Sequence, residues 1–434
     1  MPRVSPPPPR FRSGIGSRRR GSQPDFEPLE GRVLMANGLL DKTFSGDGKQ
    51  EIDFSGVKSE YRGAGASAVT MQENKIVVAG LSGPEGAILV ARLHESGSLD
   101  RTFSNDGRSE IDLPSNFGLG IRVVGVFAVS GNKILVVGSA PPSSGGADGS
   151  ILLARLNNNG SPDTNFGTGG LLEVPVTGLR YATAAEIDAN GKILVAGATG
   201  TLGISGTFTV VARLNANGSL DTGFDGDGLL FPNVQAIQQI NAIGVHANKI
   251  YLAGSAFAFG SDMAVMRLNA NGGLDTSFDN DGLQTVNFDA FDNAYAIAFQ
   301  GDKVVLAGSS QSRFAVARLT STGALDTSFD KDGKVTIAFR SRSQATGVKV
   351  QNNGQIVVAG WAENIANGFT DDFAVARLNF NGSLDPNYSD DGKHTIDFRP
   401  DDKSVSSDVA YAMVLQSNGR AVLAGRSFHA IQGG

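Results

Sequence analysis

Short runs of β-branched and other apolar residues recur along almost the whole chain, separated by polar turn-forming segments. Each run resembles the stretch from Lys75 to Gly80 and ends in a glycine. The glycines that end these runs are Gly80, Gly138, Gly197, Gly254, Gly308, Gly360 and Gly425. Runs of this composition predict strands that are buried on both faces.

A second motif, Leu-Asp-x-x-Phe, stands between these runs. Its aspartates are spaced by 59, 63, 58, 54, 51 and 59 residues; they are Asp41, Asp100, Asp163, Asp221, Asp275, Asp326 and Asp385. In every copy a leucine stands seven residues before the aspartate and a glycine three before it, and a phenylalanine or tyrosine follows three after it. Seven copies in one register identify a tandem repeat.

Each repeat predicts four short strands separated by turn formers. In one copy the predicted strands are Lys334 to Phe339, Thr346 to Gln351, Gln355 to Ala359 and Phe373 to Asn379. The pair Asn190-Gly191 is typical of a two-residue hairpin turn, because both central positions of that turn need positive φ. A four-stranded unit of about 40 to 60 residues has the size of one propeller blade. The sequence therefore predicts an all-β, seven-bladed β-propeller of four-stranded antiparallel blades.

The two ends of the chain are predicted to close this ring together. The last copy stops after Gly425, without the Ala-Arg-Leu strand of the other copies, whereas the segment from Val33 to Asp41 aligns with that strand. We therefore expect residues 32–36 to pair beside residues 420–425, so that an N-terminal strand completes the last blade and no sheet edge stays exposed. This assigns residues 32–434 to the propeller domain.

Residues 1–31 have a different composition and are predicted to be a disordered leader rich in basic, Pro, Ser and Gly residues. Residues 1–24 carry six arginines and no acid. The chain as a whole has a formal charge of -6, so the remainder stands at -6 - 6 = -12. An acidic body argues against nucleic acid as a partner. No apolar stretch is long enough to predict a membrane span, and the absence of cysteine excludes disulfides, thiolate metal sites and a cysteine nucleophile.

The repeat resembles a known family. The unit Gly-x-Leu-Asp-x-x-Phe-x-x-Asp-Gly-Lys with its Val-Val-Ala-Gly strand is similar to the delta-60 repeat, a bacterial propeller-type repeat of unassigned function, over residues 33–434. Separately, the segment from Phe26 to Ala36 behind the arginine-rich head is similar to the Leu-Glu-Pro-Arg-x-Leu-Leu leader of planctomycete surface proteins. This second resemblance implies an extracellular or cell-surface protein.

An arginine stands eight residues before six of the seven aspartates. A guanidinium can hold a carboxylate with two parallel hydrogen bonds, so the spacing predicts a structural clamp; the alternative is that the arginines face solvent. The first copy has Val33 at this position, so Asp41 is predicted to lack a partner. The predicted pairs are Arg92 with Asp100, Arg155 with Asp163, Arg213 with Asp221, Arg267 with Asp275, Arg318 with Asp326 and Arg377 with Asp385.

Two further features bear on chemistry. The acidic Phe-x-x-Asp-Gly loops, such as Asp330 with Asp332, do not have EF-hand spacing; we interpret them as tight turns, with calcium binding as the alternative, and predict no metal or other cofactor. The four histidines, His94, His246, His394 and His429, occupy unrelated positions of the repeat, and no motif of a catalytic nucleophile or phosphate loop is present. No catalytic residue is predicted.

The loops that vary in length all emerge on one face of the predicted propeller. From the Val-Val-Ala-Gly glycine to the next arginine the distance runs 12, 17, 16, 13, 10 and 17 residues. Aromatic residues on variable loops over a rigid scaffold are typical of a recognition surface, although loops also vary when nothing constrains them. The candidate ligand-face residues are Trp361, Phe257, Phe259, Phe117 and Tyr181.

These patterns favour an exported, monomeric, non-enzymatic scaffold that presents its variable loops to a protein or glycan. The alternative is a hydrolase or lyase with a site at the central channel. Two or more carboxylates and a histidine converging at one mouth of the channel would favour the enzyme, and a channel lined by small apolar residues would favour the scaffold.

Overall fold

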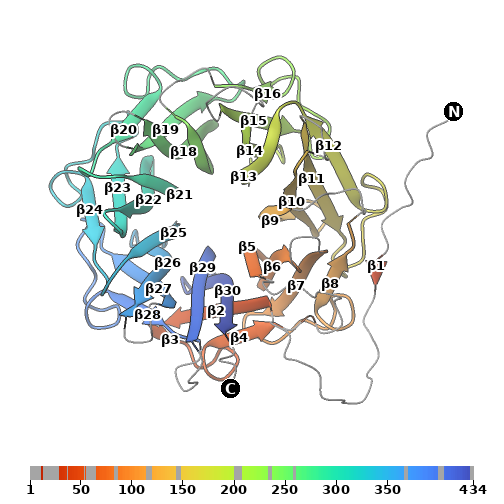
Figure 1. The fold of residues 1–434 in the computed structure, drawn as a ribbon, viewed down its shortest axis with the longest axis horizontal. Coiled ribbons are helices and arrows are strands. Elements are labelled where there is room, and N and C mark those ends of the chain that lie inside the picture. The colour runs from red at the N-terminus through yellow and green to blue at the C-terminus, as the bar shows by residue number, and fades with distance from the viewer. Residues whose placement is uncertain are drawn as a thin grey trace.

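The protein was analysed as a computed structural model. The described residues are 11–12, 29–36, 38–52, 54, 65–82, 87–113, 120–142, 148–199, 208–232, 237–257, 261–365, 370–398 and 405–430. Within this part of the chain the strands surround a common centre, and the first strand of each four-stranded sheet lies on the inner side of the ring (Figure 1). No described helix has the length and apolar character that a membrane span requires.

Five of the sheets contain four antiparallel strands each, in chain order or its reverse. Three of them contain β9 (Arg122–Val129), β10 (Lys133–Ala140), β11 (Gly149–Leu156) and β12 (Leu171–Val176); β13 (Leu179–Ile187), β14 (Ile193–Thr199), β15 (Phe208–Leu214) and β16 (Leu229–Leu230); and β17 (Gln239–His246), β18 (Lys249–Phe257), β19 (Ser261–Asn269) and β20 (Leu283–Val286). The other two contain β21 (Asn293–Gln300), β22 (Lys303–Ser310), β23 (Arg313–Leu319) and β24 (Lys334–Ile337); and β25 (Ser343–Val350), β26 (Ile356–Asn364), β27 (Thr370–Leu378) and β28 (Lys393–Ile396).

The sixth sheet joins the two ends of the chain and has ten strands. Its members are β5 (Gly65–Gln72), β6 (Lys75–Leu81), β7 (Ile88–His94) and β8 (Arg108–Ile111), together with β29 (Val405–Leu415), β30 (Ala421–Ala430), β2 (Leu29–Ala36), β3 (Leu39–Leu40), β4 (Lys49–Ile52) and β1 (Phe11–Arg12). Phe11 of β1 pairs with Ile111 of β8, inside the segment that the sequence predicted to be a leader.

The blade count corrects the sequence prediction. The described strands form six hydrogen-bonded sheets, and with each sheet counted as one blade this is a six-bladed β-propeller. The predicted seven blades are therefore wrong. The strands expected to form a separate seventh blade, β29, β30, β2 and β4, are continuous with β5–β8, because Glu30 of β2 pairs in parallel with Gly65 of β5.

The pairing of the two chain ends follows the prediction. Arg32, Val33, Leu34 and Met35 of β2 pair antiparallel with Ala424, Leu423, Val422 and Ala421 of β30, respectively. The strand begins at Leu29, so the domain boundary expected at residue 32 lies inside β2. Segments from the two ends of the sequence thus complete one sheet.

The grouping of strands within a repeat differs from the expectation by one strand. The segment from Lys334 was expected to open a four-stranded unit, but β24 pairs with β23 and is the outermost strand of the preceding sheet. Each sheet therefore begins at the next strand, as at Ser343 of β25, and ends with the strand that follows the Leu-Asp-x-x-Phe loop.

The glycine that ends each apolar run has a steric cause. A Cβ at Gly80 would lie 2.0 Å from the carbonyl oxygen of Gly65, and one at Gly254 would lie 1.8 Å from that of Gln239. Both glycines face a β-bulge in the inner strand, where the register shifts by one residue. The bulge brings the two backbones together, so only glycine fits there. Apolar side chains of neighbouring sheets then pack into shared clusters, which form the core between blades.

Candidate functional site

The arginines of the third strand and the aspartates of the repeat form ion pairs in all six predicted copies. The arginine Nε lies 2.6–2.8 Å from Oδ2 of the aspartate eight residues later. The side chain of Arg318 is fully buried, whereas that of Arg155 is 19% exposed. Each guanidinium also lies over the aromatic ring of its own repeat, as Arg318 lies 4.6 Å from the centroid of Phe329.

A second cationic residue completes the clamp, and the sequence analysis missed it. A lysine, five residues before the glycine of the apolar run, places Nζ 2.6–3.0 Å from the same Oδ2 in five copies. In the remaining predicted pair, Gln355 takes the place of the lysine and donates to Asp385 at 2.6 Å. The equivalent position at the C-terminal end is Arg420, whose Nη1 lies 2.6 Å from Asp41 Oδ2. The prediction that Asp41 lacks a partner is therefore wrong, because Arg420, directly before β30, supplies one.

These clamps connect neighbouring repeats and are structural. Arg92 Nη1 donates to Asn158 Oδ1 at 2.6 Å, and Arg267 Nη1 donates to the carbonyl oxygen of Ser321 at 2.5 Å. Each acceptor belongs to the loop of the next repeat. A group that recurs around the ring in this way has the same task in every copy, which is to hold adjacent blades together.

The electrostatics of the clamp favour the charged carboxylate. Burial raises the pKa of Asp326, but hydrogen bonds from Lys303 and Ser328 and the charge of Arg318 outweigh that effect and hold the pKa well below its usual range. The pKa values of Asp100 and Asp275 are lowered by the same balance of burial, lysine, hydroxyl and arginine. The clamp carboxylates of Asp100, Asp275 and Asp326 are therefore ionised at neutral pH.

The Asp-Gly loops use their aspartates as turn residues. Asp332 Oδ1 accepts a hydrogen bond from the backbone N–H of Lys334 at 2.9 Å, and Asp106 Oδ1 accepts one from Arg108 at 2.9 Å. Asp330 has a φ of 46°, in the left-handed region. Aspartate tolerates this conformation and bonds its own backbone two residues on, as in an Asx turn.

One mouth of the central channel lies on the side of the variable loops. The cavity there has a volume of about 910 Å³ and is lined by the first residues of consecutive inner strands. Arg122 lies 4.0 Å from the ring centroid of Tyr181, and Arg426 lies 5.8 Å from that of Tyr411. The amide side chains of Gln239 and Asn241 complete the polar lining. None of the described residues that line this mouth is acidic.

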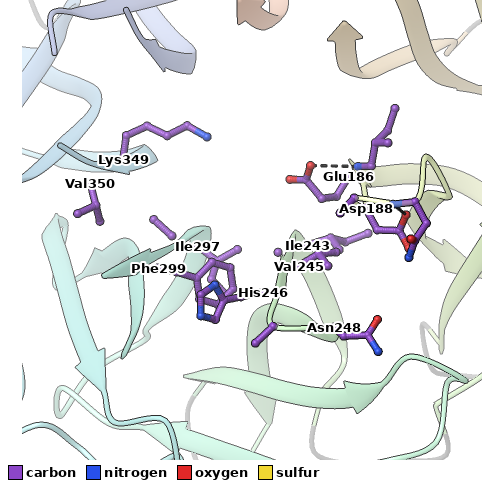
Figure 2. Close-up of a pocket in the computed structure, with 16 residues that line it drawn as sticks. Glu186, Asp188, Ile243, Val245, His246, Asn248, Ile297, Phe299, Lys349 and Val350 are labelled. Atoms are coloured by element: carbon purple, nitrogen blue, oxygen red, sulfur yellow. Dashed lines mark hydrogen bonds between the residues drawn. The ribbon is translucent and has the colours of Figure 1, made fainter. Parts of the chain in front are cut away.

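The opposite mouth has mixed charges and a largely apolar wall. Its cavity of about 550 Å³ is lined by residues that include Ile243, Ile297 and Phe299. Figure 2 shows Glu186 and Lys349 extending into this space from opposite sides. Burial raises the pKa of Glu186, and the charge of Lys349 opposes that rise.

Two acids and a histidine, Glu186, Asp188 and His246, line this second mouth. Asp188 Oδ1 accepts hydrogen bonds from the backbone N–H groups of Asn190 and Lys192 in its own turn, at 2.8 and 2.9 Å. His246 stacks on Phe299 and contacts Asp302 at 3.0 Å. Glu186, Asp188 and His246 thus line one cavity, while the described contacts of Asp188 and His246 go to other residues.

Of the candidate ligand-face residues that the structure describes, Tyr181 lies at a channel mouth. Trp361 lies within β26, where it pairs with Gln344 and Phe373, and it is half-buried rather than part of a loop. Phe257 is the last residue of β18. Phe117 and Phe259 lie outside the described residues.

A group of three carboxylates lies away from the channel, where β27, β28 and β29 meet. One carboxylate oxygen from each of Asp372, Asp397 and Asp408 lies within 4.8 Å of the other two. Burial raises the pKa of Asp372 to about 7, and the charges of Asp397 and Asp408 add to that rise. These residues could hold a hard cation, and the sequence analysis did not select them.

A signal for these missed residues is present in the sequence. Asp372 stands five residues before a clamp arginine. The corresponding residues of the other copies are Ala87, Ser150, Phe208, Asp262 and Arg313. Comparing the repeats position by position, rather than searching for what they share, would have shown that an acid stands here in two copies, at Asp262 and Asp372. For Arg122, Tyr411 and Arg426 no such signal exists, since only the ring closure brings them to one mouth.

Six segments of the chain match a family model described as a domain of unknown function (DUF5122) β-propeller. They are residues 74–103, 132–166, 189–224, 248–278, 300–329 and 351–388. This match supports a propeller-type repeat and assigns no activity. The similarity to the delta-60 repeat and to the planctomycete leader stays a prediction. No curated protein matches the sequence.

Several solved structures are similar in overall shape. An α-L-arabinanase of Penicillium chrysogenum is 10% identical, with 67% of this chain and 87% of that chain covered and a TM-score of 0.43. The α-L-arabinofuranosidase arb93a of Fusarium graminearum is 8% identical, with 81% of this chain and 98% of that chain covered and a TM-score of 0.45. The polysaccharide lyase Uly1 is 11% identical, with 92% of this chain and 99% of that chain covered and a TM-score of 0.42. Similarities at this level assign neither a substrate nor an activity to this chain.

Proposed function

We propose that this protein is a non-enzymatic β-propeller scaffold that binds an acidic glycan at the loop-side mouth of its channel. The observation that carries the proposal is the pairing of Arg122 with Tyr181 and of Arg426 with Tyr411 in a cavity without a described acidic lining residue. Two guanidinium groups at one mouth are notable in a chain with a net charge of -6. The charge of these two guanidinium groups favours an anionic ligand, and Asp371, whose carboxylate interacts with Arg426, offsets part of that charge.

The side chains of this mouth suit a uronate-containing oligosaccharide. A guanidinium can hold a carboxylate with two parallel hydrogen bonds, and a tyrosine ring offers an apolar face with a polar tip. Gln239 and Asn241 supply amide groups for sugar hydroxyls. A concave cavity of about 910 Å³ is of the size that encloses a small ligand or the end of a chain. The concave shape favours a glycan over a flat protein surface.

The alternative function, a hydrolase or lyase with a site at the channel, is supported only by the presence of Glu186, Asp188 and His246 at the second mouth. Catalysis of glycosidic cleavage usually requires two carboxylates across the scissile bond. The loop-side mouth has no acidic lining among the described residues, and at the other mouth Asp188 is held by its own turn.

We further propose that the protein works outside the cell, as the resemblance of its N-terminal segment to an export leader implies. Fractionation of the source cells, with detection of the chain by antibody, tests this directly. Recovery of the protein in the cytoplasmic fraction alone would contradict it.

Binding of oligogalacturonate to the purified chain, measured by isothermal titration calorimetry, tests the proposed ligand. Maltooligosaccharide of the same length is the neutral comparison. We expect binding of the uronate only, and we expect Arg122→Ala and Arg426→Ala each to weaken it about tenfold or more, because a charge-assisted hydrogen bond contributes about 1.5–3 kcal/mol. Lys349→Ala removes a cation from the opposite mouth and is the matched control.

Three outcomes would contradict the proposal. The first is the absence of binding to any acidic oligosaccharide. The second is equal weakening by Lys349→Ala, which would place the ligand elsewhere. The third is cleavage of the oligosaccharide during the titration, detected as new reducing ends or unsaturated products, which would favour the enzymatic alternative.

A further inference from the structure

Three adjacent segments of the sheets bring Asp372, Asp397 and Asp408 together. Asp372 lies near the start of β27, Asp397 directly follows β28 and Asp408 lies in β29; Figure 1 shows these three strands side by side. The register pairs Phe373 with Ile396, which places Asp372 beside Asp397 on neighbouring strands. Asp408 is fully buried, and its Oδ2 accepts a hydrogen bond from the backbone N–H of Phe398 at 2.9 Å. The backbone therefore fixes all three positions.

The environment of Asp372 is one that a bound cation would stabilise. This residue is only 4% exposed. Its Oδ2 accepts a hydrogen bond from Asn364 Nδ2 at 2.9 Å, but its Oδ1 is buried and has no hydrogen-bond partner. A buried carboxylate oxygen without a donor is costly, and like charges on neighbouring strands repel one another. The nearby Lys49 donates from Nζ to the carbonyl oxygens of Asp397 and Phe398.

The same arrangement of strand pairing and backbone hydrogen bond occurs at another position of the ring, where only two of the three residues are acidic. Met263 pairs with Val286, which places Asp262 beside Asn287, and Asp292 accepts a hydrogen bond from the backbone N–H of Phe288 at 2.7 Å. Asp262, Asn287 and Asp292 thus correspond to Asp372, Asp397 and Asp408. The corresponding strands adopt the same backbone arrangement with Asn287 in place of the third acid. The fold therefore does not require Asp397 at the junction of β27, β28 and β29.

We propose that Asp372, Asp397 and Asp408 form a calcium site. Carboxylate oxygens are the ligands that hard divalent cations prefer. Two oxygens that bind one Ca²⁺ ion at about 2.4 Å stand at most about 4.8 Å apart, and the oxygens of this cluster lie within 4.8 Å of one another. Mg²⁺ requires near-ideal octahedral geometry and keeps most of its water, whereas Ca²⁺ accepts the irregular oxygen set that three neighbouring strands provide.

The site has a route to solvent. Asp372 lines a cavity of about 560 Å³, together with Glu363, Asn364 and His394. The cavity admits the ion and the water molecules that would complete its coordination. A bound ion would connect the last four-stranded sheet to β29 of the ten-stranded sheet, next to the strands that close the ring.

Calcium titration of the EDTA-treated full chain tests this site. We expect one Ca²⁺ per chain by isothermal titration calorimetry, and a rise in Tm of about 2–4 °C in 5 mM CaCl2. MgCl2 at the same concentration should give a smaller rise, and NaCl of equal ionic strength none. Asp372→Asn should abolish the calcium-dependent rise, and Asp262→Asn, the matched change at the corresponding position of the ring, should leave it intact.

A gain-of-function variant guards against a simple loss of folding. Asn287→Asp completes the carboxylate set at the corresponding position of the ring and should add a second bound Ca²⁺ and a further rise in Tm. Absence of calcium binding to the unmodified chain would overturn the proposal. So would a rise in Tm that survives Asp372→Asn and is lost in Asp332→Asn, because that result would place the ion in an Asp-Gly loop.

Discussion

The repeated clamps and the acidic junction of β27, β28 and β29 both contain buried carboxylates, but they hold them in opposite ways. In a clamp such as that of Asp326, one carboxylate lies between Arg318 and Lys303, with hydroxyl and backbone donors on its other oxygen. At the junction, Asp372 faces two further carboxylates. The clamps therefore lower the pKa of their aspartates, whereas the junction raises that of Asp372 to about 7.

This difference teaches how to separate structural from functional charge in a repeat protein. The clamp recurs around the ring with an arginine and, in most copies, a lysine on the carboxylate, so its charge is compensated within the fold. The three-carboxylate group occurs at one junction among the described residues, and Asp372 there has a buried oxygen without a hydrogen-bond donor. A buried carboxylate group that the repeat does not share is therefore a better guide to a ligand than the repeat motif.

Acid should act on all clamps at once and give the largest effect. A carboxylate whose pKa is lowered in the folded state contributes stability above its unfolded pKa of about 4, and that stability is lost as the pH falls through the folded value. We expect the urea midpoint to be steady from pH 7 to 5 and to fall steeply below about pH 4. Asp326→Asn should give a shallower fall. A midpoint that does not change between pH 5 and 2.5 would show that the clamps contribute nothing.

Removal of a fully buried clamp arginine should have the next largest effect. Arg318→Ala leaves the buried carboxylate of Asp326 without its main partner, and we expect a loss of about 3–5 kcal/mol in the free energy of unfolding. Arg155→Ala, in a clamp with 19% of its arginine side chain exposed, should cost about 1–2 kcal/mol. Urea denaturation of both variants measures the contrast, and equal losses would contradict it.

Removing the charge of Asp372 at the junction should raise the stability of the fold, whereas removing the charge of a clamp aspartate should lower it. In EDTA, Asp372→Asn removes a repelling charge and keeps an acceptor for Asn364, so we expect a gain of about 1 kcal/mol. The same change in a clamp, Asp326→Asn, should be destabilising. Thermal denaturation of the two variants side by side in EDTA decides the matter. A loss of stability in both would remove the distinction between the two regions.

The lysines of the clamps should matter least. Lys303 is 32% exposed at its side chain, so solvent screens its ion pair. Lys303→Gln copies the residue found in the last repeat, where Gln355 donates to Asp385. We expect a change below about 1 kcal/mol, measured by urea denaturation. A loss as large as that of Arg318→Ala would show that lysine and arginine share the clamp equally.

The sequence predicted the elements of the fold well because their signals are local. The apolar runs became strands, their final glycines face bulges, and the arginines and aspartates eight residues apart form pairs inside one repeat. The grouping of strands was shifted by one, because strand order along the chain does not reveal which neighbour a strand at a repeat boundary will join. β24 pairs backward with β23, and nothing in its own sequence specifies that choice.

The candidate site was predicted less well. Tyr181 was selected for its aromatic side chain and lies at the loop-side mouth, but Trp361 was assigned to a loop and lies within β26. Arg426, which shares the mouth with Tyr181, lies near the other end of the chain. Residues that meet only after the ring has closed have no spacing in the sequence by which they could be associated.

The sequence by itself determined an all-β propeller repeat, the clamp arginines and the meeting of the two chain ends, since each depends on patterns within one repeat length. The tertiary structure alone decided the blade count, the partner of Asp41, the charge of the channel mouths and the assembly of Asp372, Asp397 and Asp408. A single parallel bridge between Glu30 and Gly65 joins the group β29, β30, β2 and β4 to the group β5–β8, so that the two groups form one sheet. Contacts between residues far apart in the chain decide such features, and no periodic pattern encodes them.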